Sequence, residues 1–155
     1  MSAGDQSTRV LIVAHRTAAT QPLLDAVRER ARRGPCTFTL LVPNAAHGLE
    51  KLANPDEHDE ADAQRTIEQA IPRLSEAAGS PVEGIVGTAD PSAAVQDAIN
   101  TRGFDEVIIS TLSPKISRWL RLDLPHKVAG LGLPVTTVTA SDRAGSAEQT
   151  AANAA

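Results

Sequence analysis

Short β-branched runs alternate with longer segments of helical spacing along most of this chain. Each run is rich in Val, Ile and Thr, a composition typical of β-strands. Three of the runs are too continuously apolar for a sheet that is covered on one face only. The predicted strands are residues 10–14, 37–42, 82–86, 106–110 and 135–139.

The segments between the runs carry apolar residues every three or four positions, as on one face of an amphipathic helix. The three stripes begin at Leu23, Ala63 and Ala94. Asp90 and Asp123 are predicted to cap the starts of the last two helices, and a glycine and a proline end the final one before residue 135. Pro72 lies inside the second stripe, where we expect a kink.

Strands that alternate with helices indicate right-handed crossovers and hence a parallel sheet. The sequence therefore predicts an α/β fold, a doubly wound five-stranded parallel sheet with helices on both faces. We expect one domain at residues 9–140, with flexible tails at 1–8 and 141–155 because these lack an apolar period. Ligands of such sheets bind beyond the carboxyl ends of the strands, where the strand order reverses.

Composition restricts the classes of function. Hydrophobic residues make up 41% of the chain, but no apolar run approaches a membrane span of about 20 residues. The N-terminus has no secretory pattern, so we expect a cytoplasmic protein. A net charge of −4 and 2% aromatic residues argue against nucleic-acid binding. Cys36 has no second cysteine to pair with, which favours a small buried thiol and no metal site.

Two predicted loops carry polar groups that suit a ligand. His15 and Thr17 follow the first strand, where they can hydrogen bond to a bound molecule, although a histidine in a loop is often simply solvated. The loop after the fourth strand combines hydroxyls with cations, which suits an anion such as phosphate. The alternative is a solvated loop in which Trp119 packs on the core. The candidate residues of this loop are Ser110, Thr111, Ser113, Lys115, Arg118 and Arg121.

The order and spacing of these segments resemble the universal stress protein family. The similarity covers the opening RVLIVAHRT, the middle segment VEGIVGTADPSAAVQDAINTRGFDEVIIS and the closing ISRWLRLDLPHKVAGLGLPVTTV. The resemblance implies the strand order 3-2-1-4-5. It also implies a homodimer, and the predicted edge strand from Val135 to Thr139 is the segment that a second copy would pair with.

ATP-binding members of that family have glycines in the loop after the fourth strand and an acid after the first. Here Ser110 and Ser113 stand for the first two glycines, Leu122 and Asp123 for the final pair, and His15 for the acid. A carboxylate at Asp123 would occupy the helix N-terminus that a phosphate uses. ATP or another adenine nucleotide is thus the cofactor to test, and we expect ATP to bind weakly or not at all.

The resemblance implies a regulatory or stress-response module that is not catalytic. Its ligand would be an adenine nucleotide or another small phosphorylated compound. The alternative is a nucleotide-binding enzyme of a related α/β group, a nucleotidyl transferase or a hydrolase. Against it, the sequence has no SGGxDS, GxSxG or GxxxxGK[ST] motif. We assign no catalytic residue.

Overall fold

The computed structural model describes residues 7–15, 17–43, 55–87, 91–112 and 124–140. These form one five-stranded sheet in the order β3-β2-β1-β4-β5, and all four neighbouring strand pairs of this described sheet are parallel. The predicted fold class and strand order are confirmed. β1 begins at Thr8, the last residue of the predicted N-terminal tail. The strands are β1 (Thr8–Val13), β2 (Cys36–Pro43), β3 (Glu83–Gly87), β4 (Glu106–Leu112) and β5 (Val135–Ala140).

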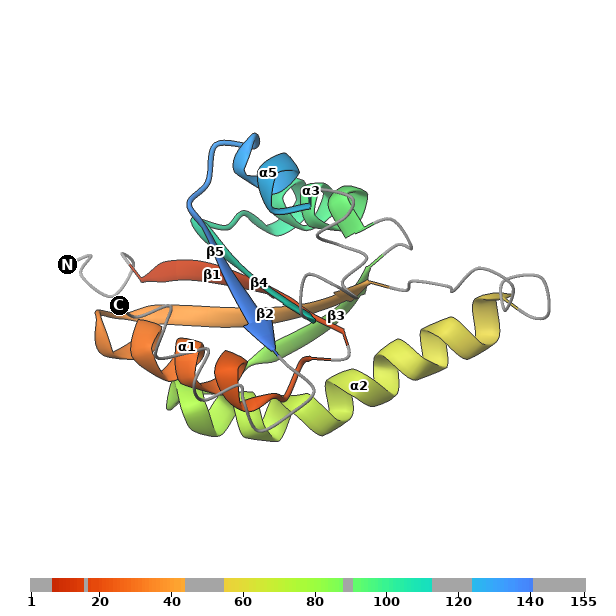
Figure 1. The fold of residues 1–155 in the computed structure, drawn as a ribbon, viewed down its shortest axis with the longest axis horizontal. Coiled ribbons are helices and arrows are strands. Elements are labelled where there is room, and N and C mark those ends of the chain that lie inside the picture. Colours follow the sequence, from red (N-terminus) through yellow and green to blue (C-terminus); the bar gives the residue numbers. More distant parts are fainter. Residues whose placement is uncertain (1–6, 16, 44–54, 88–90, 113–123, 141–155) are drawn as a thin grey trace.

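Helices cover both faces of the sheet (Figure 1). On one face lie α1 (Gln21–Arg32) and α2 (Pro55–Ala78), and on the other lie α3 (Pro91–Arg102) and α5 (Leu124–Ala129). Helix α2 continues through the exposed Pro72 to its end. No helix in the described part of the chain has both the length and the hydropathy needed to cross a membrane.

The central strand explains the continuous apolar run in the sequence. Val10 and Ile12 pack in the core beneath α1 and α2, whereas Leu11 and Val13 pack in the core beneath α3 and α5. All four side chains are completely buried. Burial of apolar surface stabilises a fold by about 25 cal/mol per Å², so β1 contributes to the cores on both faces of the sheet.

Two glycines of β3 allow close approach of the neighbouring helices. A Cβ atom at Gly84 would collide with Ile67 of α2. A Cβ atom at Gly87 would lie 2.7 Å from the Cβ atom of Ala94 in α3 and 2.8 Å from Leu41. Glycine at position 87 therefore sets how near α3 comes to the carboxyl end of β3.

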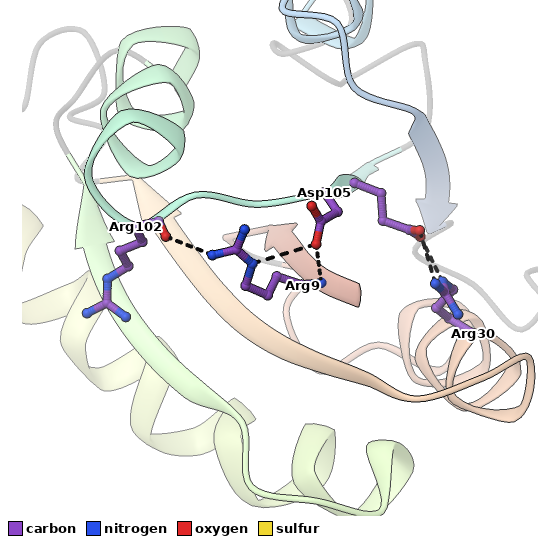
Figure 2. A network of polar contacts seen from close by, with 5 residues as sticks. Arg9, Arg30, Arg102 and Asp105 are labelled. Carbon is purple, nitrogen blue, oxygen red and sulfur yellow. Dashed lines mark hydrogen bonds and ion pairs between the residues drawn. The ribbon is translucent and has the colours of Figure 1, made fainter. Parts of the chain in front are cut away.

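Charged side chains hold the amino-terminal edge of the sheet together (Figure 2). The backbone N–H of Arg9 donates to Asp105 Oδ2 at 2.9 Å, and the Arg9 guanidinium donates to the carbonyl of Arg102 at 3.3 Å. The left-handed Gly103, with φ of 82°, ends α3 at this point. A cation at the last carbonyls of a helix is favourable, so Arg9 fixes the end of α3 against β1.

An ion pair between Arg30 and Glu106 joins the end of α1 to the start of β4. Arg30 Nε donates to Glu106 Oε2 at 2.9 Å and Arg30 Nη2 donates to Oε1 at 3.2 Å, with the two side chains 12% and 20% exposed. The hydrogen bond to Glu106 raises the pKa of Arg30. Burial raises the pKa of the neighbouring Cys36 thiol, which lowers its thiolate fraction, although the side chain is half-buried and not fully buried as predicted.

Several sequence predictions fall outside the described residues. They include the capping residues Asp90 and Asp123, and both tails except Ser7 and Thr8.

Candidate functional site

The strand order reverses between β1 and β4, at the centre of the sheet. The chain leaves β1 for α1 on one face, and the next described helix after β4 is α5 on the opposite face. The register of the two strands ends at the pair Val13 and Ile109. Ligands of doubly wound sheets bind beyond the carboxyl ends of the strands at such a topological switch point.

A hydrogen-bonded turn follows β1 at this edge. The N–H of Ala18 donates to the carbonyl of His15 at 3.2 Å, and the N–H of Thr20 donates to the carbonyl of Thr17 at 3.2 Å. The Thr20 hydroxyl donates to the same Thr17 carbonyl at 2.9 Å. His15 is half-buried and Thr17 is 2% exposed. These hydrogen bonds therefore hold the turn in place beyond the carboxyl end of β1.

The turn after β1 contacts strand β4 through a pair of hydroxyls. Thr17 Oγ1 and Ser110 Oγ lie 2.6 Å apart, and the Ser110 side chain is 1% exposed. Side chains alternate along a strand, and Ile108 belongs to the core beneath α1 and α2. Ser110 therefore points to the α1 side of the sheet, and its hydroxyl is engaged by Thr17.

Thr111 points to the opposite face. It lies two positions after Ile109, which packs in the core beneath α3 and α5, so both side chains are on the same face of the sheet. Thr111 pairs with Thr139 of β5. Thr111 is 3% exposed, and no described residue hydrogen bonds with its Oγ1 atom. A buried hydroxyl without a bond costs about 1–3 kcal/mol, so this oxygen favours a polar partner.

The structure brings four of the eight candidate residues to one edge, namely His15, Thr17, Ser110 and Thr111. Ser113, Lys115, Arg118 and Arg121 lie outside the described residues. The mutual bond of Thr17 and Ser110 was missed because the residues are 93 positions apart. The available indication was that Thr17 follows the first predicted strand and Ser110 ends the fourth, and that the strand order implied by the resemblance puts these two strands side by side.

Three of the described ion pairs lie at the amino ends of the strands. They join Arg9 to Asp105, Arg30 to Glu106 and Arg102 to Glu83. No group of three or more His, Cys, Asp or Glu side chains suited to a metal occurs in the described ranges. The candidate residues that the structure describes at the carboxyl ends are three hydroxyls and the imidazole of His15.

Comparisons with known proteins bear on the fold. No protein-family model matches the sequence, and no curated protein matches it significantly. Solved structures do match. A universal stress protein family member from Burkholderia pseudomallei superposes with a TM-score of 0.61 at 12% identity, covering 84% of this chain and 95% of that one.

Two further matches were solved with nucleotides. The universal stress protein from Archaeoglobus fulgidus in complex with dAMP has a TM-score of 0.58 at 14% identity, covering 85% of this chain and 97% of that one. A universal stress protein family protein from Arabidopsis thaliana with AMP bound has a TM-score of 0.58 at 15% identity, covering 85% and 91%.

The sheet and its polar carboxyl edge define an open, doubly wound α/β domain with its switch point between β1 and β4. More particularly, the fold is that of the universal stress proteins.

Proposed function

We propose that this protein is a non-catalytic regulatory or stress-response module of the cytoplasm. It binds an adenine mononucleotide such as AMP at the carboxyl ends of β1 and β4, and it binds ATP weakly or not at all. Support comes from the shared fold with structures that hold AMP and dAMP. The regulatory role of this chain is part of the proposal, because a shared fold does not by itself define a function.

The buried hydroxyl of Thr111 is the observation that carries the proposal. It lies at the carboxyl end of β4, where a ligand of a doubly wound sheet is expected, and no described residue satisfies it. A ligand hydroxyl or amine reaching Thr111 would gain a hydrogen bond without breaking one to a described residue. The described candidate groups nearby are hydroxyls and an imidazole, which suit the nucleoside part of a nucleotide.

Paired threonine variants test this assignment. Thr111→Val removes a hydroxyl without a described partner, so it should leave the free energy of unfolding of the free protein unchanged or slightly higher. Thr17→Val removes a bonded hydroxyl and should lower that free energy by about 1–3 kcal/mol. Chemical denaturation measures both. A loss of similar size in Thr111→Val would show that its hydroxyl is already satisfied.

Calorimetric titration with AMP then tests the site. Thr111→Val should weaken AMP binding about tenfold, the factor that about 1.4 kcal/mol gives. The control is Thr37→Val, which changes an exposed threonine at the far end of β2. Undetectable AMP binding by the unmodified protein at millimolar ligand would refute the proposed ligand.

The loop before α5 would be the part of the chain that prevents ATP from binding. The Asp123 carboxylate would repel the phosphates, and Leu122 would keep them from the backbone. The segment from Pro114 to Arg121 is also one residue shorter than in the ATP-binding members that the sequence resembles. The variant Leu122→Gly with Asp123→Ser and one residue inserted after Pro114, which restores that length, should therefore bind ATP more tightly and be less stable. Micromolar ATP binding by the unmodified chain, without a gain in the variant, would contradict this. Phosphate release from ATP by the unmodified protein would favour the alternative of an enzyme.

We also propose a homodimer through β5. β5 is an edge strand of the described sheet, and its central residues Thr136 and Thr137 are exposed. Pairing of Val135 to Thr139 with a second copy across a two-fold axis would satisfy the edge backbone groups.

Sedimentation velocity at about 50 µM, a concentration at which a dimer with a micromolar Kd predominates, tests the assembly. Thr137→Lys should shift the protein to monomer because two like charges would face each other near the axis. Gln96→Lys, on the exposed surface of α3, adds the same charge elsewhere and should not. A monomeric unmodified protein would exclude the dimer.

A further inference from the structure

The hydroxyl pair of Thr17 and Ser110 lies at the point where β1 and β4 part. The register of the two strands ends at Val13 and Ile109. Ser110 is already beyond it, paired on its other side with Val138 of β5. The 2.6 Å contact between the two hydroxyls therefore ties the turn after β1 to β4 beyond their ladder.

The anchor on the β1 side is a constrained turn. Three hydrogen bonds close residues 15–20, two from the backbone and one from the Thr20 hydroxyl. Because Thr17 belongs to this turn, its hydroxyl has a defined position when it meets Ser110. The pair is also shielded from water, with the two side chains 2% and 1% exposed. In such surroundings water cannot readily replace a lost partner.

The bond also bears on the next residue of β4. Ser110 points to the α1 side, so its neighbour Thr111 points to the α3 side. Holding Ser110 by its side chain limits the shift and rotation of the peptide that carries Thr111. The orientation of Thr111 thus depends on a contact made on the opposite face of the sheet.

We infer that Thr17 and Ser110 are a positioning pair, which sets the spacing between the turn after β1 and strand β4 and the direction of Thr111, and thereby the affinity for ligand. This inference rests on the proposed function, since Thr111 is the group that would meet the nucleotide. Neither hydroxyl needs to touch the ligand. Their contribution is preorganisation, which raises affinity by lowering the cost of ordering the site on binding.

A double-mutant cycle with AMP titration tests the inference. Thr17→Val, Ser110→Ala and the double variant should each weaken AMP binding by about five- to tenfold, without adding, because the two groups act through one bond. Thr17→Ser keeps the hydroxyl and should stay within about twofold of the unmodified protein on the same reasoning. The matched control is Thr20→Val, which removes a hydroxyl bond inside the turn but no link to β4.

AMP affinity that stays within about twofold in both Thr17→Val and Ser110→Ala would overturn the inference, since the resolution of such cycles is of that order. Amide hydrogen exchange provides a readout without ligand. The Thr111 amide should exchange about tenfold faster in Thr17→Val than in Thr20→Val if the pair restrains the end of β4.

The two proposals can therefore fail separately. If the unmodified protein binds no AMP, the proposed function fails, and the exchange of the Thr111 amide still decides whether the pair positions β4. Equal exchange in the Thr17 and Thr20 variants would reject the positioning pair.

Discussion

The ion pair between Arg30 and Glu106 gives the sharpest test of how the amino-terminal edge is held. It joins the end of α1 to the start of β4 by two hydrogen bonds, of 2.9 and 3.2 Å. We consider Glu106→Gln, which keeps the shape of the side chain, and Arg30→Met, which keeps most of its apolar stem. Each change leaves the remaining partner without its counter-charge.

The expected loss follows from the burial of the pair. At 12% and 20% exposure the side chains are shielded from solvent but not isolated from it. The loss should therefore lie below the 3–5 kcal/mol typical of a fully buried pair, at about 2 kcal/mol for either variant. For a domain of this size that is a fall in Tm of about 4–8 °C. The double variant should lose little more than either single one.

Urea denaturation of the four proteins of this cycle gives the coupling energy, which we expect at about 1–2 kcal/mol. The matched control is Arg28 with Asp25 on the same helix, an ion pair of 3.2 Å whose side chains are 45% and 46% exposed. Its coupling should not exceed about 0.5 kcal/mol. Equal coupling in the two cycles would refute the argument that burial gives the Arg30 pair its strength.

Three further predictions concern single positions. The hydrogen bond from Arg102 lowers the pKa of Glu83 below its ordinary 4.5, so the pair stabilises the fold above that pH and this contribution disappears as pH falls through the lowered pKa. Denaturation of Glu83→Gln should differ from the unmodified protein by less than about 1 kcal/mol at pH 7 and by nothing at low pH, and a gap that persists at low pH would contradict this. Gly87→Ala should cost about 1–3 kcal/mol because of contact with Ala94, and an unchanged Tm would show that α3 moves away freely. Cys36 should be alkylated at pH 8 more slowly than a free cysteine, because burial raises its pKa, and a rate equal to that of a cysteine peptide would exclude this.

The fold class and the helix layers follow from local pattern. The run at residues 10–13 is apolar at every position, and only a strand buried on both faces accommodates that at a period of two. The alternation of strands with helices predicted a parallel sheet, because crossovers of one hand allow few arrangements, and ligands of such sheets bind at the carboxyl ends of the strands. The order of the strands came from the family resemblance and not from local pattern.

Pairings between distant side chains depended on the tertiary structure. Thr17 and Ser110 were each expected near a ligand, yet they bond to each other across 93 positions. Arg30 and Glu106, 76 positions apart, formed no recognisable motif. Sequence periodicity reports which face a residue occupies, because that depends on its neighbours in the chain. Whether two hydroxyls or two charges meet depends on the packing of helices against the sheet, to which every core residue contributes.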